Sequence, residues 1–152
     1  MKKTLRILHL EDDPDFSALV RALLEREALP TELCVVSTRA DFEKALSGGN
    51  FDIILADYLL PEYNGIEALR CARAKCPQTP FLLVSGTIGE QAAIECLRCG
   101  ATDYVLKNKI ERLAPTVRRA VQEAEERAHR KRIESELVRR EKYFPIERTK
   151  SI

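Results

Sequence analysis

The stretch Phe51-Asp52-Ile53-Ile54-Leu55-Ala56-Asp57-Tyr58-Leu59-Leu60-Pro61-Glu62-Tyr63-Asn64-Gly65 decides the fold. It contains an apolar run that is too short for a helix and that ends abruptly on the carboxylate of Asp57. Such runs are typical of strands that are buried on both faces of a parallel sheet. Asp57 is therefore expected at the carboxyl end of a core strand, where open α/β sheets bind ligands. Pro61 prevents further ladder pairing, and Asn64-Gly65 supplies turn residues before the next helix.

Strand and helix patterns alternate along the rest of the chain. Four more short apolar segments are predicted to be strands, and apolar residues at helical spacing follow each of them. The further strands are predicted at residues 5–10, 32–37, 81–84 and 104–106. Five strands that alternate with helices favour an α/β fold of parallel βαβ units, so the carboxyl ends of all five strands are expected at one edge of the sheet.

The length and composition bound the class of protein. The chain has 152 residues, of which 45% are hydrophobic and 32% charged, so it is long enough to bury the core of one domain with an appendage. Its net charge of +1 implies no general attraction to polyanions. No apolar segment approaches membrane-spanning length, and Met1-Lys2-Lys3 leads into a short strand, so a cytoplasmic location without membrane contact is expected.

The cysteines and the first histidine are interpreted as structural. Five cysteines, an odd number scattered through core-like patterns, favour reduced thiols over a disulfide framework. Cys96 and Cys99 have the spacing of a redox pair, but they fall inside a helical pattern, which disfavours a redox role. His9 lies within the first strand and is interpreted as a core or sheet-face histidine rather than a ligand.

Three carboxylates, a hydroxyl and an ammonium are expected to meet at the carboxyl edge of the sheet. They belong to Glu11, Asp12, Asp57, Ser85 and Lys107, which follow or end four different strands. Clustered carboxylates repel one another unless a cation neutralises them. Because the set offers hard oxygen ligands without His or Cys, Mg²⁺ is the expected cation.

This set of side chains suits phosphoryl transfer. Asp57 is predicted to act as a carboxylate nucleophile toward phosphorus, which gives an acyl phosphate. Mg²⁺ on one side and Lys107 on the other would offset the charge of the equatorial oxygens, and Ser85 would donate a hydrogen bond to the product. Each residue alone has a simpler interpretation: Asp12 as a helix cap, Ser85 as a turn residue and Lys107 as a solvated charge. Only their combination indicates phosphoryl chemistry.

Four signatures together resemble the receiver domain of two-component response regulators. They are Ile7-Leu8-His9-Leu10-Glu11-Asp12-Asp13, the segment from Asp57 to Gly65, Ser85-Gly86, and Asp103-Tyr104-Val105-Leu106-Lys107, in the order that the family has them. The resemblance covers about residues 4–125. It implies a flavodoxin-like (βα)5 fold, a doubly wound five-stranded parallel sheet, here with an extended C-terminal helix.

The resemblance also implies a role for each residue of the edge and for two more positions. Asp57 is similar to the phospho-acceptor, Glu11 and Asp12 to the acidic pair that holds Mg²⁺, the Leu59 carbonyl to the backbone metal ligand, Ser85 to the switch hydroxyl, Tyr104 to the rotating aromatic, and Lys107 to the phosphate-binding lysine. The implied partners are a histidine kinase or phosphotransfer protein and a downstream output domain or protein. The implied output is a change in the face made by the fourth helix, fifth strand and fifth helix.

Two positions depart from the family pattern. A proline usually follows the lysine through a cis bond, whereas Asn108 stands here. Because a non-proline cis bond costs about 3 kcal/mol, the local geometry is left open. Leu59 occupies the position that, in the family it resembles, influences the hydrolytic water, and an apolar side chain cannot orient a water molecule. We therefore expect a phosphoryl group that lasts longer than in members with a polar residue there.

The C-terminal part is expected to be helical. Residues 1–125 are assigned to the receiver domain, and residues 126–152 to a helical extension with an irregular tail from Pro145. The apolar stripe thins after Ala128 and no sustained heptad is visible, so a homodimer through this helix and a single solvated helix both stay open. The helix has interspersed Glu and no helix-turn-helix pattern, so direct nucleic-acid binding is not expected.

The function predicted from the sequence is a phospho-accepting receiver, either stand-alone or part of a longer signalling protein, and not an enzyme apart from slow autodephosphorylation. One alternative is a haloacid-dehalogenase-like phosphatase with Asp57 as its nucleophile. Such enzymes usually carry a second Asp where this chain has Leu59, and a cap domain for which this chain has no length. The other alternative, a phosphorylation-independent scaffold, is disfavoured by the complete acidic, hydroxyl and lysine set.

Overall fold

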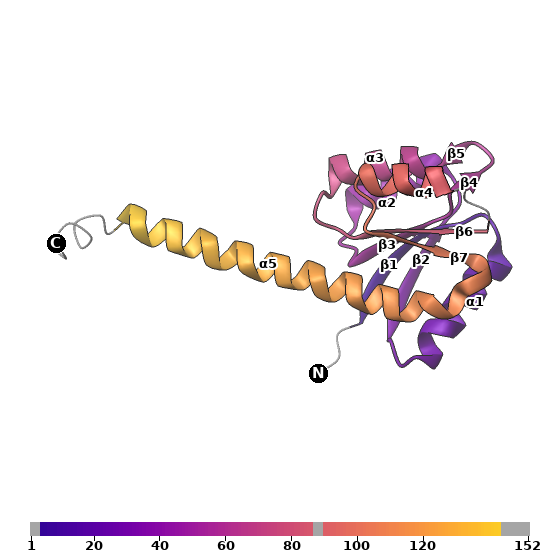
Figure 1. The fold of residues 1–152 in the computed structure, drawn as a ribbon, viewed down its shortest axis with the longest axis horizontal. Coiled ribbons are helices and arrows are strands. Elements are labelled where there is room, and N and C mark those ends of the chain that lie inside the picture. The colour runs from indigo at the N-terminus through magenta and orange to yellow at the C-terminus, as the bar shows by residue number, and fades with distance from the viewer. Residues whose placement is uncertain (1–3, 87–89, 144–152) are drawn as a thin grey trace. The chain divides into compact units, whose positions relative to one another are not determined.

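The computed structural model describes residues 4–86 and 90–143 and shows helices packed on a five-stranded parallel sheet (Figure 1). The strands of this sheet are β1 (Leu5–Leu10), β2 (Thr31–Val36), β3 (Ile53–Ala56), β6 (Phe81–Ser85) and β7 (Asp103–Leu106). They lie in the order β2-β1-β3-β6-β7, and every pair is parallel. Numbered along the chain, these five strands have the order 2-1-3-4-5, which confirms the expected flavodoxin-like fold. The tail from Pro145, expected to be irregular, lies outside the described residues.

Helices cover both faces of the sheet. They are α1 (Pro14–Arg26), α2 (Arg39–Gly48), α3 (Gly65–Lys75), α4 (Glu90–Arg98) and α5 (Leu113–Tyr143). The first turns of α5 lie with α1 on one face, and α2, α3 and α4 lie on the other (Figure 1).

Neighbouring residues of a strand point to opposite faces of the sheet, so each strand contributes side chains to two hydrophobic cores, one on each face. In β1, Ile7 packs under α1 and α5, whereas Leu8 packs under α2, α3 and α4. In β3, all four residues are fully buried, as the short apolar run before Asp57 predicted. Burial on both faces fixes the place where β3 ends.

Helix α1 begins where its capping residues require. Asp13 is the N-cap, and its side chain accepts a hydrogen bond of 3.0 Å from the backbone N–H of Asp15. Pro14 occupies the first helical position, where its missing N–H costs nothing. The start of α1 is therefore held directly behind Glu11 and Asp12.

Helix α5 begins at Leu113, so its proline, Pro115, lies within the first turn and not at the first helical position.

A small hairpin follows Asp57. Strands β4 (Leu59–Leu60) and β5 (Tyr63–Asn64) pair antiparallel, an arrangement that the sequence did not predict. The Asn64 side chain then caps α3 by accepting a hydrogen bond of 2.9 Å from the Glu67 N–H. The Gly65 N–H donates to the Tyr58 carbonyl at 2.8 Å. The chain directly after Asp57 is thus tied to the start of α3.

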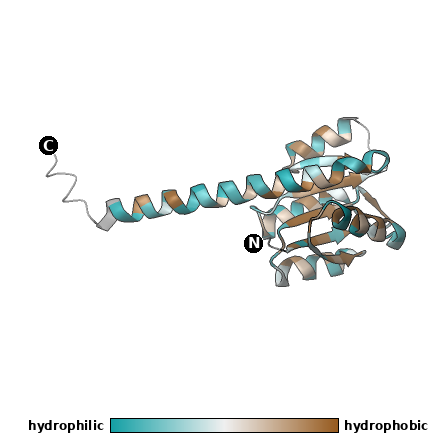
Figure 2. Ribbon diagram, turned by 90° about the horizontal axis from the view of Figure 1, so that it is seen from below, coloured by the Kyte–Doolittle hydropathy of each residue, from teal (hydrophilic) through white to brown (hydrophobic). Residues whose placement is uncertain are grey.

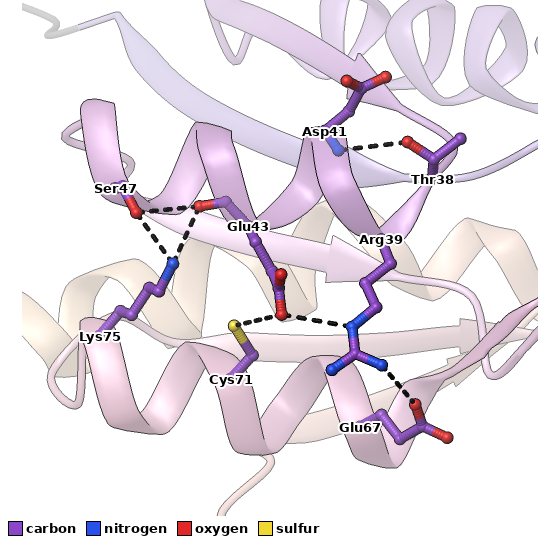
Figure 3. A network of polar contacts seen from close by, with 8 residues as sticks. All are labelled: Thr38, Arg39, Asp41, Glu43, Ser47, Glu67, Cys71 and Lys75. Carbon is purple, nitrogen blue, oxygen red and sulfur yellow. Dashed lines mark hydrogen bonds and ion pairs between the residues drawn. The ribbon is translucent and has the colours of Figure 1, made fainter.

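A polar network joins α2 to α3 (Figure 3). Arg39 lies 3.4 Å from Glu43 in its own helix and 3.9 Å from Glu67 in α3. The Lys75 ammonium donates to the Ser47 hydroxyl at 2.9 Å and to the Glu43 carbonyl at 3.2 Å. These charges are exposed, so each pair adds at most about 1 kcal/mol to stability and mainly fixes the register of the two helices.

The chain divides into two compact units, residues 1–121 and 122–152. In the second unit α5 continues to Tyr143 and consists mostly of hydrophilic residues (Figure 2). Three of its apolar side chains, Ile133, Leu137 and Val138, are exposed. Among the described residues no helix combines the length and the hydropathy that crossing a membrane requires.

Candidate functional site

The carboxyl edge of the sheet brings three carboxylates together. Glu11 and Asp12 follow β1, Asp57 follows β3, and these two strands are neighbours. One carboxylate oxygen from each of the three residues lies within 4.8 Å of the others. Glu11 is 2% exposed and Asp57 is 8% exposed, whereas Asp12 is open to solvent. The site is therefore half-buried, with an open side at Asp12.

Lys107 reaches the same carboxylates from the end of β7. Its ammonium lies 3.0 Å from Glu11 Oε1 and 3.3 Å from Asp57 Oδ2. It also lies over the ring of Phe16, 4.2 Å from the ring centre. Two carboxylates and an aromatic face thus surround one ammonium. Lys107 starts a short 3₁₀ segment (Lys107–Arg112), and all described peptide bonds are trans, including the one between Lys107 and Asn108.

The carboxylates at the edge are held in fixed orientations. Glu11 Oε2 accepts the backbone N–H groups of Asp12 at 3.1 Å and Asp13 at 3.2 Å. Asp57 Oδ1 accepts the N–H of Leu59 at 3.3 Å, while Oδ2 faces Lys107. Because each oxygen of Asp57 has one donor, its carboxylate keeps lone pairs for a further ligand.

The electrostatics of the edge favour a cation. Three carboxylates and one ammonium give a formal charge of −3 + 1 = −2. Burial raises the pKa of Glu11, and repulsion by Asp57 adds to this rise, while Lys107 acts against it. Burial lowers the pKa of Lys107, but its contact with Glu11 and the charge of Asp57 outweigh burial and raise it. The oxygen-only donor set and the unbalanced negative charge fit Mg²⁺.

Ser85 and Tyr104 belong to β6 and β7, the two strands on the far side of β3 from β1. Ser85 is buried at the end of β6, and no hydrogen bond joins it to Asp57 within the described part of the chain. Tyr104 is 40% exposed. It lines a groove of about 510 Å³ beside β7 and the first turns of α5, together with Asp103 and Arg119. The switch roles of both residues, and the Leu59 carbonyl as a metal ligand, stay predictions.

Two further residues, His9 of β1 and Phe16 of α1, lie behind the edge. His9 is fully buried, as expected of a core histidine, and burial, followed by the charge of Lys107, lowers its pKa to about 4. The Phe16 ring packs against it, with 6.2 Å between the ring centres. Phe16 is one of the apolar residues at helical spacing that follow the first strand, a pattern that predicts packing against the sheet. No sequence signal indicated the contact between Phe16 and Lys107, because that contact depends on the conformation of the long Lys107 side chain.

The comparisons agree on one family. The family model of the response regulator receiver domain matches residues 7–118. A swarming motility regulation protein of Serratia marcescens, RssB, is 35% identical over 104 residues, which are 68% of this chain and 46% of that protein. The chain spans less than half the length of the curated relatives it matches first.

Solved structures show the same architecture. A CheY-like response regulator receiver domain protein from Methanospirillum hungatei is 25% identical with a TM-score of 0.73, over 82% of this chain and 99% of that one. The receiver domain of the sensor histidine kinase PA1611 from Pseudomonas aeruginosa is 25% identical with a TM-score of 0.68, over 79% and 99%. In that protein a magnesium ion is coordinated in the active-site cleft.

Proposed function

Because the chain belongs to the response regulator receiver family of two-component systems, we propose that Asp57 accepts a phosphoryl group at a magnesium-dependent site. The observation that carries this proposal is the meeting of Glu11, Asp12 and Asp57 with the ammonium of Lys107 at one edge of the sheet. A lone aspartate at a strand end would not support it. Three carboxylates with one ammonium form both a cation site and a phosphate site.

In the transfer step, a carboxylate oxygen of Asp57 attacks phosphorus. The bond from phosphorus to its leaving group breaks, and an acyl phosphate forms on Asp57. The Lys107 ammonium, now 3.3 Å from Oδ2, donates to the phosphoryl oxygens as their charge develops. The Leu59 N–H keeps the other oxygen oriented. Glu11, Asp12, Asp57 and the Leu59 carbonyl would hold a Mg²⁺ ion, and the ion would supply further positive charge for the phosphoryl oxygens.

The phosphoryl group then changes the surface that is available to a partner protein. Its oxygens offer acceptors to the Ser85 hydroxyl at the end of β6 and compete for the Lys107 ammonium. A shift of Ser85 and Tyr104 would alter the α4–β7–α5 face, where Asp103 and Arg119 form an ion pair beside the groove. Phosphorylation acts in this scheme as a local change of charge that shifts a population of conformations.

The partners that fit this function are a histidine kinase or phosphotransfer protein as donor and an output domain or protein as receiver of the signal. The curated relatives are longer than this chain, so an output module elsewhere in a longer protein is consistent with them. We propose a cytoplasmic location without membrane or direct nucleic-acid contact. A homodimer is part of the proposal, and a beryllofluoride-activated NtrC4 receiver domain is a dimer in solution.

Intact-mass measurement after incubation with acetyl phosphate and Mg²⁺ tests the proposal. We expect stable addition of one phosphoryl group to the wild type and to Asp41→Asn, which changes an exposed aspartate of α2, and none to Asp57→Asn. Chelation of Mg²⁺ should prevent the addition. Continuous phosphate release with turnover would instead indicate an aspartyl phosphatase, and no addition would indicate a scaffold.

A further inference from the structure

We propose that Phe16 is a positioning residue for phosphoryl transfer: its ring holds the Lys107 ammonium at the carboxylate edge. This inference rests on the proposed function of Asp57 and Lys107. Lys107 has a flexible stem of four carbons, and the loss of that freedom must be offset by contacts. Two of them are with Glu11 and Asp57, and the third is the face of the Phe16 ring, 4.2 Å from Nζ.

The ring is itself held in place. Phe16 is the third residue of α1, and the Asp13 cap fixes the start of that helix behind Glu11. The side chain is 9% exposed and packs in the core that also contains Val20. Its other neighbour is the fully buried ring of His9, tilted by 58° at a centre distance of 6.2 Å. The Phe16 ring can therefore serve as a fixed surface for a mobile cation.

An aromatic face suits this task better than another acceptor would. The ring attracts the positive charge through its quadrupole and does not consume a particular N–H group. An ammonium has three N–H groups and no acceptor. Lys107 can therefore turn a donor from Asp57 Oδ2 to a phosphoryl oxygen while it keeps its contact with Phe16. A third carboxylate at this place would bind the ammonium more tightly and compete with the phosphoryl group.

The substitution Phe16→Leu removes the quadrupole but keeps an apolar side chain, and Phe16→Tyr keeps the aromatic face. We expect Phe16→Leu to weaken beryllofluoride binding in the presence of Mg²⁺, and to slow phosphorylation by acetyl phosphate, by about three- to tenfold. Phe16→Tyr should stay close to the wild type. Fluorine NMR measures the first quantity and intact mass the second, each corrected for the folded fraction from circular dichroism.

A control separates positioning from mere loss of packing. Phe42→Leu truncates another buried phenylalanine, which belongs to the core on the opposite face of the sheet. It should lower stability but leave beryllofluoride binding by the folded fraction unchanged. A double-mutant cycle adds Lys107→Met to Phe16→Leu. If Phe16 acts through Lys107, its substitution has no further effect on beryllofluoride binding once the ammonium is gone, whereas additive effects would overturn the inference.

A second measurement does not depend on phosphorylation. In the wild type, the ring current of Phe16 should shift the CεH₂ protons of Lys107 upfield, and their signal is identified by its loss in Lys107→Met. The shift should vanish in Phe16→Leu and persist in Phe16→Tyr. An unshifted signal in the wild type overturns the inference even if Asp57 is phosphorylated. If the wild type binds no beryllofluoride, the proposed function fails, and the NMR signal alone then decides whether Phe16 holds Lys107.

Discussion

Lys107 and Glu11 form a tight ion pair, with 3.0 Å between Nζ and Oε1, at the place where a metal ion is proposed to bind. The ammonium is nearer to Glu11 than to Asp57, which lies 3.3 Å away. The lysine thus neutralises part of the carboxylate charge that Mg²⁺ would use. A metal ion bound there would share the carboxylates with the lysine, so the affinity for the ion would depend on the presence of the ammonium.

The coupling predicts that Lys107→Met binds Mg²⁺ more tightly than the wild type. Removal of one positive charge beside the site lowers the repulsion of a divalent cation, and the gain should be on the order of tenfold in affinity. Isothermal titration with MgCl₂ at constant ionic strength measures it. The same variant should accept a phosphoryl group from acetyl phosphate more slowly. Lys109→Met, in the same 3₁₀ segment, is the control, and equal affinities in all three proteins would contradict the coupling.

Leu59→Asn should shorten the life of the phosphoryl group on Asp57. The Leu59 side chain is 61% exposed, while its N–H is bound to Asp57 Oδ1. The substitution therefore places an amide next to the acceptor at little cost in packing, and that amide can orient a water molecule. We expect hydrolysis to accelerate several-fold, which is less than the roughly 100-fold of even weak general acid–base catalysis, because an amide orients the water but does not take its proton. Loss of the phosphoryl mass over time, after removal of acetyl phosphate, gives the rate.

The matched control for this substitution is Leu137→Asn. Leu137 is also an exposed leucine, but it lies in α5 within the unit of residues 122–152. Its rate of phosphate loss should equal that of the wild type. An unchanged rate in Leu59→Asn would show that the apolar side chain does not set the lifetime.

The strand pattern predicted the sheet and the edge because both follow from local signals. An apolar run of strand length that stops at a charge places Asp57 at a strand end, and the parallel direction of the strands then puts the ends of β1 and β3 at the same edge of the sheet. The strand order could not be derived from spacing. It came from the resemblance to a family, and the structure confirms it.

Tertiary features were not predictable in the same way. The β4–β5 hairpin involves only two residues in each strand, too few for any periodic pattern. The contact of Lys107 with Phe16 joins a strand end to a helix 91 positions earlier in the chain, and it depends on the path of one flexible side chain. Neither feature follows from the spacing of apolar residues, because that spacing predicts helices and strands and not the contacts between them.

The Cys71 thiol should react slowly with alkylating reagents at neutral pH. Burial raises its pKa, and the charge of Glu43, whose Oε1 lies 3.8 Å from Sγ, raises it further (Figure 3). A raised pKa means less thiolate at every pH below it, and the thiolate is the nucleophile. Alkylation of Cys71 by iodoacetamide should therefore lag behind that of the exposed Cys34 and increase at higher pH. Peptide mass mapping over a pH series measures both residues.

Glu43→Gln tests the cause of this slow reaction. The substitution removes the negative charge beside the thiol, so the pKa of Cys71 should fall and its alkylation should accelerate, while the rate at Cys34 stays constant.

The raised pKa of Cys71 in the folded state also affects stability. The unfolded state loses the thiol proton at a lower pH than the folded state, so Cys71 should lower the free energy of unfolding as pH rises above the ordinary thiol value. If Cys71 were alkylated as fast as Cys34, the explanation by burial of the Cys71 thiol would be wrong.

Two glycines of the same chain should respond in opposite ways to alanine. A Cβ at Gly65 would lie 2.7 Å from Leu83 Cδ2 and 3.1 Å from the Cα of Tyr58, and Leu83 is buried. Gly65→Ala should therefore cost about 1–3 kcal/mol of unfolding free energy as overpacking. A Cβ at Gly48 meets nothing within 4 Å, so Gly48→Ala at the end of α2 should be neutral or stabilise by up to about 1 kcal/mol. Urea denaturation compares them.

The Gly65 substitution should also affect the proposed phosphorylation of Asp57. Its N–H donates to the carbonyl of Tyr58, the residue directly after Asp57, so a displaced Gly65 moves the chain that orients the acceptor. We expect slower phosphorylation by acetyl phosphate per folded molecule in Gly65→Ala and an unchanged rate in Gly48→Ala. Equal stability of both variants would show that the close approach of α3 to β3 and β6 is not constrained at Gly65. A loss of stability without a change in the phosphorylation rate would show that the displacement at Gly65 does not alter the orientation of Asp57.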